Sequence, residues 1–360
     1  MKELDELLAA HKVARRSRER CLLATLVKVE GSSYRRVGAR MLMTAGGGRT
    51  SAISGGCLEA EIQKKAWWLT EQGPVIQQYR TSTEEGLGMP YGLGCSGTLH
   101  VLLKRVSEDD SDWLESLGRL RTDRTYAALA TALTGPAIGT QWLFPAEENN
   151  QRAMQAGAAV ENALGRVAAQ ATSEYLQLDG VEFFLEALPP RQRLIVFGAG
   201  DDAKPLVKFA RLLGWDVTIA DGRTHLATEA RFPEATSVVA APPAELAQRC
   251  AIRGDDAVVV MTHSFEQDQA LLGAMLAKPL RYLGQLGPRQ RTRELLAAIA
   301  SESGSPLALD RLHSPIGLDI GAHTPETIAL AIIAEVQSVL SKLDLAGVAK
   351  TKAYATGVPA

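Results

Sequence analysis

Cysteine is scarce in this sequence, and its spacing excludes several kinds of site. The chain of 360 residues has four widely separated cysteines and lacks both a Cys-x-x-Cys pair and a Cys-x-x-Cys followed by His-x-x-x-His. The six histidines are dispersed and lack the i, i+4 spacing of a helical metal site. A structural zinc site is therefore not expected. Free thiols in a reducing compartment fit this cysteine usage best.

Long hydrophobic runs and an excess of one charge are also missing. No apolar run approaches the ~20 residues that span a bilayer, and the amino terminus lacks the basic region of a signal peptide. The 39 Lys and Arg residues against 41 Asp and Glu residues give a net charge of −2. Such a charge exerts no general attraction for nucleic acid or for an anionic membrane. We therefore predict a cytoplasmic protein that binds neither.

Apolar patterning in the first part of the chain predicts a mixed α+β domain. A helical period covers residues 58–72, and strand-like runs occupy residues 20–29, 41–44, 50–54 and 99–104. An acidic, polar break at 107–112 predicts a domain boundary. The prediction is an amino-terminal domain at 1–106 and a middle α+β segment at 107–190, where Pro189-Pro190 ends it.

Beyond residue 191 the pattern changes to alternating strands and helices. Short, apolar, β-branched runs appear at 194–197, 216–220 and 257–261, with a helical pattern at 204–213. This alternation is typical of βαβ units in a doubly wound parallel sheet. We predict a Rossmann-like domain at 191–345 and a loose tail at 346–360, so that the whole chain is of the α/β class.

Two of the cysteines lie in glycine turns. Ser54-Gly55-Gly56-Cys57 runs directly into a predicted helix that carries Glu59, and Gly94-Cys95-Ser96-Gly97 forms a second turn. Glycine lets the backbone approach a ligand closely, whereas a cysteine buried for packing normally lies in an apolar run. The turns indicate ligand contact through Cys57 and Cys95. The alternative is a pair of tight turns with incidental cysteines, because an unpaired cysteine is most often a small core residue.

The loop at 30–40 is a second candidate for ligand contact. It contains Gly31, Ser32, Ser33 and Arg40, and hydroxyl and guanidinium groups beside a glycine suit an anionic ligand. Taken alone, the same loop is equally a basic surface loop.

A Rossmann-type turn follows the first strand of the second half. Gly198-Ala199-Gly200 precedes a helix, and Asp221 ends the next strand, where an acid hydrogen-bonds a ribose in dinucleotide-binding proteins. However, Ala203 holds the position of the third glycine, and Asp201 and Asp202 place negative charge where a pyrophosphate would lie. These features disfavour NAD(P) and favour a sheet used for another ligand or for assembly.

Two further side chains follow predicted strands. His263 follows the strand at 257–261, at the sheet edge where ligands bind in doubly wound folds. It is either a site residue or a loop histidine bonded to nearby backbone. Arg289 follows a Gly-Pro pair at a predicted helix start, where it suits a phosphate, although arginines on helix faces are usually solvated.

Several of these motifs together resemble the XdhC/CoxI family of xanthine dehydrogenase accessory proteins. The resemblance is carried, in this order, by residues 30–41, 54–59, 92–97, 196–200, 220–223, 260–263, 282–289 and 315–322. It covers nearly the whole chain except the middle segment and the tail. The chain differs from the family pattern at Asp201, where histidine is frequent, and at Ser96, where glycine is usual.

The resemblance implies a molybdenum-cofactor chaperone without turnover chemistry of its own. Such a protein holds molybdopterin as cargo and delivers it to an apo molybdenum hydroxylase of the xanthine dehydrogenase type. A cysteine desulfurase and a second copy of the chain are further implied partners. Cofactor-binding residues would be Gly31, Ser32, Ser33, Arg40, Gly55, Gly56, Cys57, Glu59, Cys95, Gly198, Gly200, Asp221, Arg223, His263 and Arg289.

Within that set, Cys57 and Cys95 are the candidate reactive thiols and the candidate molybdenum contacts, because a soft thiolate suits such a metal. Two other functions stay open. One is an NAD(P)-dependent oxidoreductase that uses the unit from Gly198 to Asp221, and the other is a non-catalytic scaffold that binds partner proteins.

Overall fold

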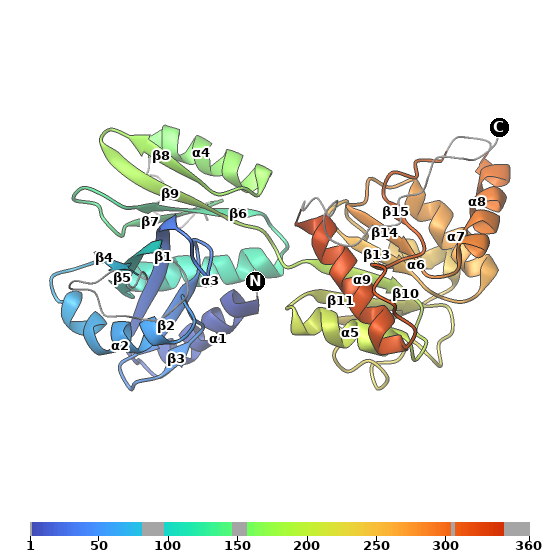
Figure 1. Cartoon of the computed structure of the whole chain (residues 1–360), viewed down its shortest axis with the longest axis horizontal. Coiled ribbons are helices and arrows are strands. Elements are labelled where there is room, and N and C mark those ends of the chain that lie inside the picture. Colours follow the sequence, from blue (N-terminus) through green and yellow to red (C-terminus); the bar gives the residue numbers. More distant parts are fainter. Residues whose placement is uncertain (1, 81–96, 146–156, 304–306, 342–360) are drawn as a thin grey trace. The chain divides into compact units, whose positions relative to one another are not determined.

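The computed structural model describes residues 2–80, 97–145, 157–303 and 307–341, except for the side chains of Cys57 and Asp109. The chain divides into two compact units, Met1–Pro190 and Arg191–Ala360 (Figure 1). The further divisions predicted at residues 106 and 345 stay predictions. Among the described helices, none is long and apolar enough to cross a bilayer.

The first unit contains a five-stranded antiparallel sheet in the order β3-β2-β1-β5-β4. Its strands are β1 (Cys21–Gly31), β2 (Arg40–Thr44), β3 (Arg49–Thr50), β4 (Val75–Arg80) and β5 (Gly97–Arg105). The helices α1 (Lys2–Arg16), α2 (Cys57–Leu69) and α3 (Glu108–Thr122) pack against it. The strands predicted at 20–29, 41–44 and 99–104 and the helix predicted at 58–72 are therefore present, as β1, β2, β5 and α2.

Both faces of this sheet are buried. Successive β1 side chains point to opposite sides of the sheet, and each side is covered by helices. Leu22, Ala24 and Leu26 pack in one core cluster with residues of α2. Cys21 and Leu23 lie in another, with residues of α1 and α3. The central strand therefore consists almost entirely of apolar residues.

A second antiparallel sheet completes the first unit, in the order β7-β6-β9-β8. Its elements are β6 (Ala127–Ala132), β7 (Gln141–Phe144), β8 (Glu174–Leu178) and β9 (Val181–Leu188), with α4 (Gly157–Gln170) over one face (Figure 1). Val27 and Leu102 of the first sheet pack with Phe184 of the second. The two sheets therefore share a core.

The second unit is a six-stranded parallel sheet in the order β12-β11-β10-β13-β14-β15. The strands are β10 (Arg193–Phe197), β11 (Asp216–Asp221), β12 (Ser237–Ala240), β13 (Ala257–Val260), β14 (Tyr282–Gln285) and β15 (Leu312–His313). From β10 the strands β11 and β12 are added on one side, and β13, β14 and β15 are then added on the other side. This reversal makes a topological switch point between β10 and β13. This confirms the predicted doubly wound, Rossmann-like fold.

Helices cover both faces of the parallel sheet. The helices α5 (Ala203–Leu212) and α9 (Pro325–Leu340) lie on one face (Figure 1). The helices α6 (Pro243–Arg249), α7 (Phe265–Leu276) and α8 (Arg289–Ser303) contribute to the core on the other. With both faces buried, the strands have no polar side, which explains their continuous apolar runs.

One predicted strand is much shorter than expected. The sequence predicts a strand at 50–54, but β3 ends at Thr50. Ser51 has a φ of 66°, a left-handed conformation that does not continue a strand. The backbone turns there instead and reaches the start of α2.

Candidate functional site

Several predicted site residues of the first unit lie near the end of β1 in its first sheet. Because β1 and β5 are antiparallel, the end of β1 and the start of β5 meet there, and Gly31 pairs with Gly97. The loop at 32–39 begins at this edge and leads to Arg40, the first residue of β2. Residues 51–56 lead from the end of β3 into α2. Antiparallel pairing thus brings the end of β1 and the start of β5 together, whereas Arg40 pairs with Thr25, further back along β1.

Gly97 must be a glycine because another backbone segment touches it. A Cβ at this position would lie 2.3 Å from the carbonyl oxygen of Ser32, a distance that real Cβ atoms do not reach. Cys95 lies outside the described residues. Gly97 comes two positions after Cys95 and is the first residue of β5. It lies against Gly31 and Ser32.

The turn before Cys57 is organised by the Glu59 carboxylate, which is 1% exposed. It accepts hydrogen bonds from the Ile53 amide at 3.0 Å, the Gly56 amide at 2.9 Å and the Ser54 hydroxyl at 2.7 Å. Glu59 thereby holds both ends of the turn that starts α2. Cys57 is the first residue of that helix. Gly55 and Gly56 are exposed, and Gly56 has a φ of 121°.

The surroundings of Glu59 keep it ionised. Burial raises the pKa of this carboxyl, but hydrogen bonds from Ser54 and from backbone amides lower it more, so that the pKa lies below its ordinary value. Both of its carboxylate oxygens accept hydrogen bonds from residues of the turn. The structure therefore gives Glu59 a part in shaping the turn, and its predicted contact with a cofactor stays a prediction.

We expect Glu59→Gln to lower the free energy of unfolding of the first unit by about 1–3 kcal/mol, because charge-assisted hydrogen bonds to buried amides are lost. The pKa of Glu59 is depressed on folding, so its contribution is complete above the ordinary value of 4.5 and is lost as the pH falls through the folded-state value. Urea unfolding at neutral pH and below pH 4.5 measures both effects. Glu61→Gln, on the same helix, should change stability by only about 0.5 kcal/mol. Equal effects of the two changes at neutral pH would contradict this role of Glu59.

Arg40 is engaged inside the protein. Its Nη1 donates to Glu186 Oε1 at 2.8 Å and to the Gly38 carbonyl at 2.9 Å, and its Nη2 pairs with Glu186 Oε2. The side chains of Arg40 and Glu186 are only 5% and 10% exposed. Arg40 thus ties the 32–39 loop to β9, and its predicted contact with an anionic ligand stays a prediction. Sequence reasoning missed Glu186, although a lone carboxylate in the apolar strand 183–188 was an available signal.

The rest of the 32–39 loop is more open. Gly31 and Ser32 are exposed, and the Ser33 hydroxyl accepts from the Arg35 amide at 3.3 Å. Arg35 forms an ion pair with Glu3, and this hydrogen bond is the main reason that the pKa of Arg35 is raised. The negative charge of Glu59 contributes to the same shift. The basic loop and the turn before α2 are therefore electrostatically linked.

In the second unit, Gly198 lies where β10 meets β13. A Cβ there would lie 2.4 Å from the Met261 carbonyl oxygen, and Gly198 has a φ of 131°. Gly200 follows after Ala199, and a Cβ at Gly200 would lie 2.4 Å from Asp202 Oδ1. The carboxylate of Asp202 thus lies directly beside the glycine turn.

Asp221 at the end of β11 is fully buried and bonded within the chain. It accepts from the Ala199 amide at 2.7 Å and from Arg223, whose amide, Nε and Nη2 lie at 2.8, 3.0 and 2.7 Å. Arg223 also donates to the Thr262 carbonyl at 3.2 Å. Asp221 and Arg223 therefore join the ends of β10, β11 and β13.

His263 and Asp202 face each other across the switch point. His263 Nε2 lies 2.7 Å from Asp202 Oδ2, and His263 has a φ of 64°. The His263 side chain is 58% exposed. The buried Asp268 accepts from the Thr262 hydroxyl at 2.6 Å and from Arg291 at 2.9 Å, which holds the backbone before His263 in place.

Arg289 takes no part in the contacts around Asp221 and His263. It is the exposed first residue of α8. Within the described part of the chain, its guanidinium has no hydrogen-bond or ion-pair partner. Because β14 is parallel to β13, Arg289 follows the same edge of the sheet as His263.

The described cysteines and acids do not form a metal centre. In the described ranges, no three His, Cys, Asp or Glu side chains are placed to hold an ion. Cys21 and Cys250 are buried, and burial raises the pKa of both thiols, that of Cys250 to about 11. A raised pKa suppresses the reactive thiolate, which leaves Cys57 and Cys95 as the candidate reactive thiols.

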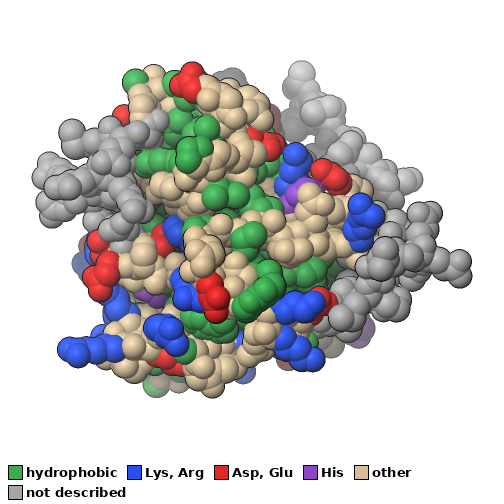
Figure 2. All heavy atoms as spheres, turned by 90° about the vertical axis from the view of Figure 1, so that its left-hand side faces the viewer, with side chains coloured by type: hydrophobic (Ala, Val, Ile, Leu, Met, Phe, Trp, Pro, Cys, Tyr) green, Lys and Arg blue, Asp and Glu red, His purple; other side chains and the backbone are tan. Residues whose placement is uncertain are grey.

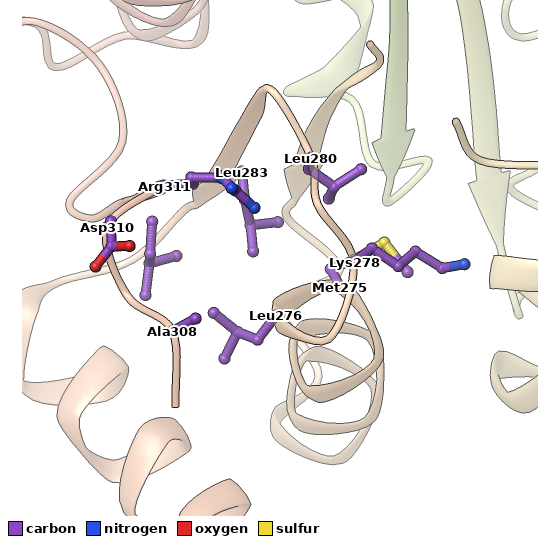
Figure 3. A pocket seen from close by; sticks show the side chains of 9 residues that line it. Met275, Leu276, Lys278, Leu280, Leu283, Ala308, Asp310 and Arg311 are labelled. Atoms are coloured by element: carbon purple, nitrogen blue, oxygen red, sulfur yellow. The ribbon is translucent and has the colours of Figure 1, made fainter. Parts of the chain in front are cut away.

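A pocket in the second unit lies away from the candidate residues (Figure 3). It lies near the end of α7 and the starts of β14 and β15, whereas His263 and Arg289 follow the opposite, carboxyl ends of strands. Its lining is largely apolar and consists of Met275, Leu276, Lys278, Leu280, Leu283, Ala308, Asp310, Arg311 and Leu312. We assign no function to it.

Comparison with known proteins places the chain in a family. Residues 194–336 match the model of the XdhC Rossmann domain, and residues 14–80 match that of the XdhC and CoxI family. A probable xanthine dehydrogenase subunit from Bacillus subtilis is 31% identical over 319 residues, which are 88% of this chain and 92% of that protein. The molybdenum cofactor insertion chaperone PaoD from Escherichia coli is 26% identical over 326 residues, 88% of this chain and 83% of that protein.

A solved structure agrees with these sequence matches. The crystal structure of a xanthine dehydrogenase from Bacillus halodurans superposes with a TM-score of 0.73 at 30% identity, and the match covers 94% of this chain and 97% of that one. The likeness therefore extends over both units. This chain belongs to the XdhC and CoxI family.

Proposed function

We propose that this protein is an accessory chaperone in the maturation of a molybdenum hydroxylase. It binds the molybdenum cofactor as cargo, shields it and delivers it to the apo-hydroxylase, without turnover chemistry of its own. The observation that carries the proposal is the match to a molybdenum cofactor insertion chaperone over 83% of that protein's length. We propose further that it acts in the cytoplasm as a homodimer, with a cysteine desulfurase as a second partner.

The edge formed by β1, β5 and the start of α2 supports a site for such a cargo. It offers exposed glycines at residues 31, 55 and 56 and the exposed guanidinium of Arg36. Exposed glycine backbone permits close approach of a ligand, and the start of a helix favours an anion such as a phosphate. Cys57 begins the helix at this edge, and we propose that it and Cys95 supply the soft ligands or sulfur acceptors that the cargo requires.

The hydrogen bonds and ion pairs in the second unit disfavour an NAD(P)-dependent oxidoreductase. Asp221, which would bind the ribose, is bonded to Ala199 and Arg223. Asp202 lies beside Gly200 and pairs with His263, so a carboxylate stands where the glycine turn would meet a pyrophosphate. We therefore propose the chaperone rather than an NAD(P)-dependent oxidoreductase.

The proposal is tested on protein co-expressed with the cofactor pathway. Metal analysis and the fluorescence of oxidised pterin are measured on one sample, which is also assayed for bound NAD(P). Stoichiometric molybdenum and pterin are expected. Bound nicotinamide without molybdenum would overturn the proposal and favour the oxidoreductase. Absence of both would favour a scaffold that binds partner proteins.

We predict that Cys95→Ser lowers the retention of molybdenum about tenfold or more, in line with the loss seen when a metal's supporting groups are removed. The fold should stay intact, because a cysteine in a glycine turn contributes little to a core. Metal content per protein and a thermal melt measure the two effects. Cys21→Ala, which changes a buried thiol at the opposite end of β1, is the control and should retain the cofactor. Normal retention in Cys95→Ser would remove Cys95 from the site.

A further inference from the structure

The carboxyl end of α2 carries an unusual surface. Trp67 and Trp68 are consecutive there, and Trp68 is 68% exposed. A single exposed hydrophobic residue is common at a protein surface, whereas aromatic and arginine side chains grouped together are typical of an interaction site. We define the tryptophan patch as Trp67, Trp68 and the cations Arg20, Lys64 and Arg105.

Trp67 is held by two of these cations. The guanidinium carbons of Arg20 and Arg105 lie 5.6 and 5.7 Å from the centre of a Trp67 ring. Arg105 also donates to the Trp67 carbonyl at 2.5 Å and to the Thr70 hydroxyl at 3.1 Å. These contacts fix the orientation of the guanidinium groups beside the indole and leave their positive charges unneutralised.

The charge of the patch is largely uncompensated. Throughout the described ranges, no carboxylate pairs with Arg20, Lys64 or Arg105, whereas Lys65 of the same helix pairs with Glu61 at 2.9 Å. Two carboxylates are close in sequence. Glu19 accepts from the Gly46 amide at 2.8 Å, and Glu71 is exposed just beyond the helix.

The tryptophan patch is close enough to the candidate site for one bound protein to cover both. Along α2, the rise from Cys57 to Trp68 is about 17 Å, and a standard interface covers about 800 Å² on each partner. Figure 2 looks onto this side of the first unit and shows apolar side chains among Lys and Arg side chains, with some Asp and Glu side chains between them. A partner seated on the patch would therefore reach the start of the helix.

We propose that the tryptophan patch is the docking surface for an acidic face of the apo-hydroxylase, an inference that rests on the proposed function. Tryptophan and arginine are the side chains that most often dominate binding at protein interfaces. The three cations complement carboxylates on the partner and accelerate encounter. A second copy of this chain fits less well, because a two-fold interface centred on the patch would place like charges against each other.

The test measures binding of the cofactor-free molybdenum hydroxylase from the same organism to the immobilised full-length chain by surface plasmon resonance. Trp68→Ala should weaken binding by about 30-fold or more, with an unchanged thermal melt because the side chain is exposed. Arg20→Glu and Lys64→Glu should slow association and reduce its dependence on salt. Leu212→Ala, which removes a side chain 63% exposed in the second unit, is the matched control and should bind normally.

Cofactor retention separates this inference from the proposed function. Trp68→Ala should retain molybdenum and pterin like the wild type. If the wild type binds the hydroxylase and Trp68→Ala binds it equally well, the docking surface is overturned while the chaperone stands. If Trp68→Ala converts a dimer to a monomer in sedimentation, the patch is an interface between copies and the proposal is overturned. A wild type that retains neither cofactor nor hydroxylase would overturn the proposed function itself.

Discussion

Replacing Glu186 by alanine is expected to lower the free energy of unfolding of the first unit by about 3–5 kcal/mol. Glu186 and Arg40 form a two-pronged ion pair whose side chains are 10% and 5% exposed. Removing the carboxylate leaves a buried guanidinium with the Gly38 carbonyl as its remaining partner at hydrogen-bond distance. The cost arises because a buried charge without its counter-charge cannot recover the hydration that it has in the unfolded chain.

Urea unfolding of the full chain measures this effect. Trp67, Trp68, Trp113 and Trp142 lie in the first unit and Trp215 lies in the second, so tryptophan fluorescence reports mainly on the first. The double variant Arg40→Met with Glu186→Leu should recover most of the loss, because an apolar pair needs no hydration.

Glu182→Ala is the matched control for Glu186→Ala, since Glu182 forms a more exposed pair with Lys28 at 3.3 Å. Its loss should cost less than about 1 kcal/mol. An equally small cost for Glu186→Ala would contradict the structural role of the buried pair. It would also leave Arg40 available for the anionic ligand that the sequence predicts.

The second large effect is expected at Asp221. Asp221→Ala should lower the free energy of unfolding of the second unit by about 1–3 kcal/mol, because the backbone amide of Ala199 loses its buried acceptor and Arg223 loses its charged partner. The Ala199 amide and the Arg223 side chain lose an acceptor at 2.7 Å each. The ends of β10 and β11 are then no longer tied together, and the glycine turn that starts at Gly198 loses its support.

This loss should depend on pH. Burial raises the pKa of Asp221, but hydrogen bonds from Arg223 and Ala199 lower it more, so that the pKa lies below its ordinary value of 3.8. The contribution of Asp221 is therefore complete above the ordinary value and declines as the pH falls through the folded-state value. Urea unfolding at pH 7 and near pH 3, followed by circular dichroism, should show a smaller difference between wild type and Asp221→Asn at the lower pH.

Asp201→Ala serves as the control for Asp221, since the Asp201 side chain is 78% exposed and pairs with Lys204 and Arg231 at the surface. Exposed pairs of this kind contribute little. If Asp221→Asn lowered the free energy of unfolding by the same amount at both pH values, the charge of Asp221 would not be the source of its contribution to stability.

Several features of this protein follow from the sequence alone. The apolar runs at 194–197 and 257–261 predict buried parallel strands, which the structure has as β10 and β13. The Gly-Ala-Gly turn predicts a sharp connection, and Gly198 does adopt a φ that favours glycine. The order of motifs along the chain predicts the family. These inferences succeed because they depend on local sterics and on side-chain period, which a linear sequence contains.

Other features were decided only by the tertiary structure. Arg40 and Glu186 lie 146 positions apart, so no local pattern could show that the predicted anion-binding arginine has a buried partner. Asp221 matches a ribose-binding motif, yet its oxygens are taken by Ala199 and Arg223.

A residue's type and spacing thus define which chemistry it can perform, and packing determines whether it is free to perform it. Polar groups that are buried on folding must find partners within the chain, and the identity of those partners depends on which strands and loops become neighbours.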